Sequence, residues 1–101
     1  MKTLVLVADD IRAIVRSIGL DQIMDRTIEA LEQTLGDVSD SRYQSPTRDG
    51  FNYAEPGTGL IEWMPVIDEG RSATIKLVGY HPENPDKHQL PTILSTTLNV
   101  D

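Results

Sequence analysis

Cysteine is absent from this sequence of 101 residues. Without thiols the chain cannot form a disulfide, a cysteine nucleophile or a cysteine-ligated metal site. The sequence also lacks any apolar run long enough to cross a bilayer, and its apolar start is too short for a secretory signal. We therefore expect a cytoplasmic protein.

Basic side chains are scarce. Nine Lys and Arg stand against 16 Asp and Glu, which gives a formal net charge of −7. Phosphate backbones attract clustered Lys and Arg, so this balance argues against a nucleic-acid partner. With 39% hydrophobic and 25% charged residues, the composition is that of one small soluble domain.

The first part of the chain predicts a strand and a short helix. Residues 3–7 are rich in β-forming side chains and predict an opening strand. Asp9 or Asp10 then suits the N-cap of a helix that ends at Gly19. The apolar side chains of this helix recur at helical spacing, at Ile11, Ile14, Val15 and Ile18.

A longer second helix follows, with Asp21 as its expected cap and Gly36 at its end. Its apolar side chains are spaced by four, three and four residues, which places them in one stripe: Met24, Ile28, Leu31 and Leu35.

The remaining sequence, residues 37–101, predicts a sheet joined by turns and loops. Gly- and Pro-rich turns are expected at 56–59 and 68–70, and a loop with three prolines is expected at 79–91. The expected strands are 42–43, 60–64, 74–78 and 92–100. The predicted fold class is α+β, a single domain of 1–101 with two helices packed on a mostly antiparallel sheet and no Rossmann domain.

Two motifs invite a functional interpretation that their context does not favour. The pair of glycines at 57 and 59 is followed by Glu62 and a strand, so a hairpin turn explains it better than a dinucleotide loop. A loop with two histidines and two acids could ligate a metal, but the spacing matches no zinc pattern: His81, Glu83, Asp86 and His88. We therefore expect no metal and no cofactor-binding residue in this chain.

Three basic residues are candidate ligands for an anion. Lys76 lies in the middle of an expected strand, where it faces either solvent or a cleft that strengthens its attraction for a carboxylate. Arg42 and Arg48 flank a proline-containing segment, and an arginine at either position is either a surface residue or a bidentate carboxylate ligand.

Taken in order, these features resemble the ornithine cyclodeaminase/mu-crystallin family over essentially the whole chain. Four segments carry the resemblance together with Arg42, namely 59–65 (GLIEWMP), 73–78 (ATIKLV), 79–85 (GYHPENP) and 90–93 (LPTI). The resemblance implies an NAD- or NADP-dependent enzyme that passes hydride between the nicotinamide and an amine- or imine-bearing carbon. It implies that this part binds the small amino-acid or imino-acid substrate and forms a homodimer through its sheet. An exposed sheet edge and apolar face also predict a homodimer or larger species that buries Trp63.

By the same resemblance, Arg42 and Lys76 are the carboxylate ligands and Thr92 lies near the pocket wall. Arg48 is the alternative to Arg42, because residues 50–58 resemble an insertion between the arginine segment and the Met-Pro strand. The nucleotide-binding domain and the catalytic residues of the family have no counterpart in the sequence, so we expect the chain alone to be inactive. The alternative function is a stand-alone, non-catalytic dimeric binding module derived from this fold.

Overall fold

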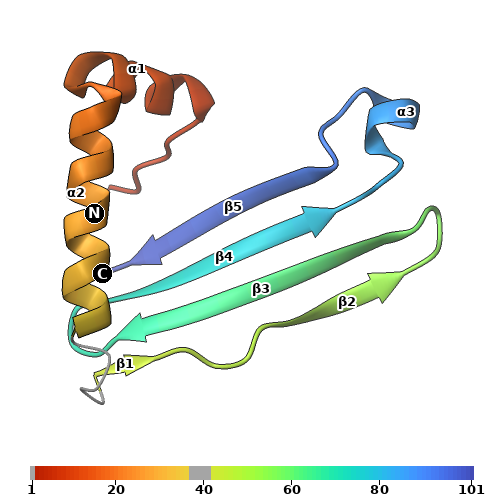
Figure 1. Ribbon diagram of the computed structural model, residues 1–101. Coiled ribbons are helices and arrows are strands. Elements are labelled where there is room, and N and C mark those ends of the chain that lie inside the picture. The colour runs from red at the N-terminus through yellow and green to blue at the C-terminus, as the bar shows by residue number, and fades with distance from the viewer. Residues whose placement is uncertain (1, 37–41) are drawn as a thin grey trace. The chain divides into compact units, whose positions relative to one another are not determined.

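Two successive helices form the amino-terminal part of the computed structural model, which describes residues 2–36 and 42–101 (Figure 1). They are α1 (Ala8–Ile18) and α2 (Leu20–Gly36). Between them, Gly19 has a φ of 95°, a conformation that suits glycine, and its N–H donates to the Val15 carbonyl at 2.8 Å. The predicted helix end at Gly19 is therefore confirmed.

The start of α1 differs from the prediction of an aspartate cap. Val7 occupies the N-cap position, and its N–H donates to Oδ2 of Asp10 at 2.9 Å. Asp10 thus supports the helix from its third position, as the acidic member of a capping box does. The prediction that Asp9 or Asp10 is the cap is wrong, and α2 likewise begins before Asp21, at Leu20.

The predicted opening strand is also wrong, because residues 3–7 adopt no regular structure. β-forming side chains make a strand only where a neighbouring strand satisfies the backbone hydrogen bonds. Among the described strands, none pairs with this segment. Its large apolar side chains remain exposed, Leu4 at 82%.

A five-stranded sheet forms the rest of the described chain (Figure 1). Its strands are β1 (Tyr43–Gln44), β2 (Asp49–Tyr53), β3 (Gly59–Asp68), β4 (Ser72–Tyr80) and β5 (Ile93–Val100). The order is β1-β3-β4-β5, β2 also pairs with β3, and every pairing is antiparallel. The α+β class with two main helices and a mostly antiparallel sheet is confirmed.

Two elements were not predicted from the sequence. Residues 49–53 lie outside the strands expected from the sequence, but they form β2 and pair with the first half of β3. The loop expected at 79–91 contains a short helix, α3 (Asn84–His88), with Pro85 in its first turn. Proline is favoured there because its missing N–H has no helical partner at that position.

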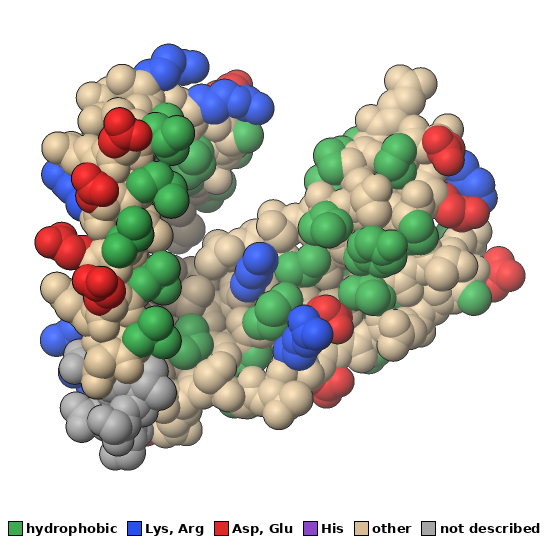
Figure 2. All heavy atoms as spheres, viewed as in Figure 1, with side chains coloured by type: hydrophobic (Ala, Val, Ile, Leu, Met, Phe, Trp, Pro, Cys, Tyr) green, Lys and Arg blue, Asp and Glu red, His purple; other side chains and the backbone are tan. Residues whose placement is uncertain are grey.

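The chain forms two compact units, Met1–Ser39 and Asp40–Asp101. Within the first unit, the apolar stripe predicted for α2 is exposed, from Met24 at 49% to Leu35 at 71% (Figure 2). No hydrophobic side chain in the described ranges is fully buried. Exposed apolar surfaces of this extent mark packing or interaction surfaces. The packing of the helices on the sheet stays a prediction.

None of the helices in the described part of the chain is both long enough and apolar enough to cross a membrane.

Candidate functional site

Lys76 projects from the centre of the sheet on one of its two faces. It pairs with Met64 of β3 on one side and with Thr97 of β5 on the other. Two residues that pair directly across neighbouring strands lie on the same face of the sheet, and so does every second residue along each strand. We call this surface the Lys76 face, and its central members are Leu60, Glu62, Met64, Asp68, Thr74, Lys76, Val78, Thr97 and Asn99. A hydrogen bond of 2.7 Å from Thr74 to Asn99 lies on it.

Arg48 reaches the same face from the opposite side of β3. Asp49 pairs with Trp63, so the preceding residue in the extended chain lies beside Met64. The Arg48 Nη1 atom lies 4.0 Å from Oε2 of Glu62, which agrees with this placement. Arg48 and Lys76 therefore flank Met64 from the two neighbouring strands, with their backbones separated by about 10 Å.

Glu62 is a site residue that the sequence reasoning missed. It lies two residues before Met64 on β3 and has one-third of its side chain exposed. The sequence does contain a signal for this residue. Glu62 is an acid between apolar neighbours in an expected strand, and it lies two residues before Met64, so both side chains share one face. The Glu62 carboxylate places a negative charge on the Lys76 face, 4.0 Å from the Arg48 guanidinium group.

Arg42 occupies a different part of the sheet. Its Nε atom lies 2.6 Å from Oδ1 of Asp68, at the end of β3, and its Nη2 donates to the Tyr43 hydroxyl at 2.5 Å. Asp68 is on the Lys76 face but four residues beyond Met64, which is about 13 Å along a strand. The structure thus brings Arg48, rather than Arg42, to the side of the residue that pairs with Lys76.

Thr92 lies just before β5, one residue from the pair formed by Tyr80 and Ile93. Its carbonyl accepts a hydrogen bond of 2.8 Å from the His81 N–H. Thr92 forms a bend outside the strand and lies five residues before Thr97, the β5 partner of Lys76, which is about 17 Å along a strand. The four predicted site residues therefore divide, with Arg48 and Lys76 together and Arg42 and Thr92 apart from them. Substrate contact by any of them stays a prediction.

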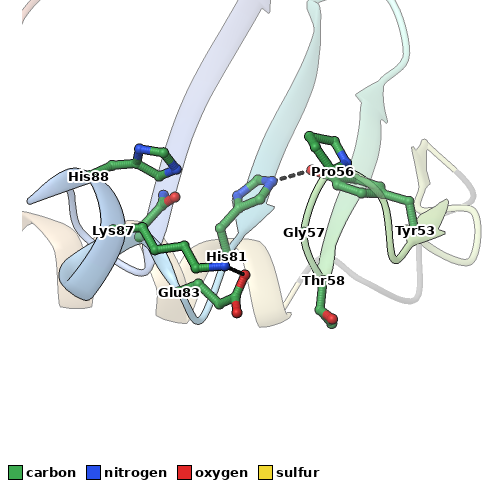
Figure 3. Close-up of a pocket in the computed structure, with 9 residues that line it drawn as sticks. Tyr53, Pro56, Gly57, Thr58, His81, Glu83, Lys87 and His88 are labelled. Atoms are coloured by element: carbon green, nitrogen blue, oxygen red, sulfur yellow. Dashed lines mark hydrogen bonds and ion pairs between the residues drawn. The ribbon is translucent and has the colours of Figure 1, made fainter.

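A separate pocket of about 430 Å³ lies at the end of the sheet where β2 and β3 are joined (Figure 3). The His81 ring lies against Gly59, where an added Cβ would come within 2.7 Å of it. The Tyr53 hydroxyl is hydrogen-bonded to Nε2 of this ring, and Glu83 forms an ion pair of 2.9 Å with Lys87 (Figure 3). These contacts shape the loop that was considered as a metal site. Across residues 2–36 and 42–101, no group of three or more His, Asp or Glu is placed to hold a metal.

Comparison with known proteins gives this geometry its context. The L-lysine cyclodeaminase of Streptomyces rapamycinicus is 34% identical over 102 residues, which span 100% of this chain and 30% of that protein. The chain also superposes on a solved lysine cyclodeaminase with a TM-score of 0.86. That structure is described as the structural basis for recognition of L-lysine, L-ornithine and L-2,4-diamino butyric acid by the enzyme. It is 40% identical, and the match spans all of this chain and 30% of that one.

The chain thus spans about 30% of the length of the relatives that it matches. Residues 9–101 match the ornithine cyclodeaminase/mu-crystallin family. This match covers nearly the whole sequence and agrees with the family resemblance carried by the Met-Pro strand and the loop around His81. The chain therefore belongs to the ornithine cyclodeaminase/mu-crystallin family.

Proposed function

We propose that this chain is the substrate-binding and dimerisation part of an NAD(P)-dependent cyclodeaminase that acts on a diamino acid such as L-lysine or L-ornithine. One observation carries the proposal, which is that Arg48 and Lys76 flank Met64 on the same face as Glu62. Two cations and one carboxylate at this spacing complement an amino acid, which carries one carboxylate and at least one ammonium group.

The two cationic side chains would bind the substrate carboxylate above Met64. Arg48 supplies a planar fork for a bidentate contact, and Lys76 supplies a compact ammonium group. Two cations in the empty site repel each other, and an anion between them relieves that repulsion. Glu62, beside Arg48, would accept hydrogen bonds from a substrate ammonium group.

The nicotinamide would be bound elsewhere in the protein. The family is NAD(P)-dependent, and this sequence holds no dinucleotide fingerprint. The nicotinamide supplies the hydride acceptor. The residues described here would hold the amino acid in position for that transfer, because hydride transfer requires the two reactants at near-attack distance.

The opposite side of the sheet would form the dimer. We call it the Trp63 face, and its large apolar members are Phe51, Ile61, Trp63, Ile67, Ile75, Leu77, Leu94 and Leu98. Several of them are largely exposed, including Phe51 at 65%. A second copy of the chain would remove this apolar surface from water.

Calorimetric titration with L-lysine tests the substrate site. We expect Lys76→Met to weaken L-lysine binding by roughly tenfold or more, because it leaves the carboxylate with one cation fewer. Cadaverine, which lacks the carboxylate, should bind equally to both proteins.

Lys87→Met is the matched control, since Lys87 lies on α3 and pairs with Glu83. Equal loss of L-lysine binding in the control, or none in Lys76→Met, would contradict the proposal.

A further inference from the structure

We propose that Arg42 is a positioning residue, which acts with Asp68 and Tyr43 as a clamp that holds Arg48 on the Lys76 face. This inference rests on the proposed function, because the role of Arg48 as a carboxylate ligand is itself proposed. It assigns to Arg42 a different task from the direct substrate contact that its place in the sequence suggested.

The clamp attaches both the side chain and the main chain of Arg42 to the end of β3. Arg42 Nε and Asp68 Oδ1 lie 2.6 Å apart and are both removed from solvent. The guanidinium carbon lies 4.8 Å from the centre of the Tyr43 ring. The Arg42 carbonyl accepts a hydrogen bond of 3.0 Å from the Glu69 N–H. Because both atoms are removed from solvent, separating them would leave a buried charge without its partner, which costs more than breaking an exposed ion pair.

The segment that follows the clamp carries one residue more than the strand it faces. Gln44 pairs with Ile67 and Asp49 pairs with Trp63, so residues 45–48 lie opposite residues 64–66. Residues 45–48 are not paired with β3, and the extra residue among them breaks the alternation of side chains between the two faces once. Pro46 has no N–H to contribute to a ladder here. The segment is therefore held by pairing at its two ends rather than along its length.

Arg48 depends on both of these ends. A shift of one residue along a strand moves every side chain to the other face of the sheet. If the clamp is released, the extra residue can move along the segment, and Arg48 then loses its place beside Met64. The distance of about 13 Å between Asp68 and Met64 along β3 supports this indirect role over a direct contact of Arg42 with a ligand at Lys76.

Nuclear magnetic resonance of the full chain without ligand tests the clamp directly. In Asp68→Asn we expect the backbone amides of residues 47–50 to shift and to lose protection from hydrogen exchange, while those of residues 74–78 remain unchanged. Glu83→Gln, which removes the ion pair with Lys87, is the control that should leave residues 47–50 unaffected. Where Asp68→Asn fails to fold, Asp68→Glu displaces the same carboxylate by one methylene. Unchanged signals at residues 47–50 in a folded variant would overturn the proposal.

A double-mutant cycle with L-lysine then separates positioning from a general loss of stability. Asp68→Asn should weaken L-lysine binding about tenfold in the natural background and have no further effect in an Arg48→Ala background. An equal loss in both backgrounds would show that Arg42 or Asp68 acts independently of Arg48, and would overturn the proposal. If Arg48→Ala and Lys76→Met both leave L-lysine binding intact, the proposed function fails, and the exchange measurement still decides whether the clamp holds Arg48.

Discussion

A Cβ atom added at position 50 would lie 2.2 Å from the carbonyl oxygen of Ile61 and 2.9 Å from Cα of Glu62. Both distances are shorter than non-bonded atoms tolerate, and both neighbours are backbone atoms that cannot rotate away. We expect Gly50→Ala to push β2 away from β3 and to lower the free energy of unfolding by about 1–3 kcal/mol. Urea denaturation would measure this loss.

The control for this change is Gly36→Ala, at the last residue of α2. An added Cβ there has no neighbour within 4 Å. Alanine is a better helix former than glycine, so Gly36→Ala should leave stability unchanged or raise it by up to about 1 kcal/mol. A loss of stability in Gly36→Ala as large as that in Gly50→Ala would show that the close approach of β2 to β3 is not the cause.

At the scale of single residues, the sequence indicated which residues could bind a carboxylate, but not which of them lie close together. Lys76 was correctly expected in the middle of a strand. The choice between Arg42 and Arg48 could not be made, because it depends on the unpaired segment between β1 and β2. The extra residue in that segment follows from how β1 and β2 each pair with β3, and no local pattern in residues 42–49 indicates this pairing.

At the scale of elements, turns were easier to predict than strands. Gly70, with a φ of 77°, lies in the turn of a hairpin whose two strands, β3 and β4, could both be recognised. The turn before Gly59 was also recognised, but of its two flanking strands only β3 was. β2 escaped recognition because Asp49, Gly50 and Asn52 have low strand propensity, and its pairing with β3 overrides that propensity. Residues 3–7 show the converse, since strong propensity without a paired neighbour gives no strand.

The N-cap of α1 offers a test at this scale. Val7 has an extended conformation, with φ −104° and ψ 172°, and makes no side-chain cap hydrogen bond. A serine in this conformation can accept a hydrogen bond from the first turn, so Val7→Ser should stabilise α1 by about 1 kcal/mol. Circular dichroism during thermal unfolding would record the gain in helix stability.

The comparison for Val7→Ser is Val5→Ser, which makes the same chemical change at an exposed position before the cap. It removes a similar apolar side chain but offers no hydrogen bond to the helix. A gain of equal size in both variants would show that removal of exposed apolar surface, and not capping, is responsible.

At the scale of the whole molecule, the amount of apolar surface left exposed is the dominant property. Small domains bury only part of their surface, but a chain of this size ordinarily holds some fully buried hydrophobic side chains. Over the described ranges there are none. Within each of the two units, the apolar side chains of α2 and of the Trp63 face therefore remain available for packing on another surface.

The Trp63 face gives the prediction about assembly. Phe51 lies against Trp63 with ring centroids 5.2 Å apart in an edge-to-face arrangement, and 65% of Phe51 is exposed. Aromatic pairs of this kind are typical anchors of protein interfaces. A dimer formed through this face would bury both rings, so Phe51→Glu should place a charge in the interface and dissociate it. Sedimentation velocity at tens of micromolar should then show a dimer for the natural chain and a monomer for the variant.

Asn52→Glu is the matched control. Asn52 is the next residue of β2 and points to the other face, so this substitution should leave the dimer intact. A monomeric natural chain, or dissociation of both variants, would refute this interface.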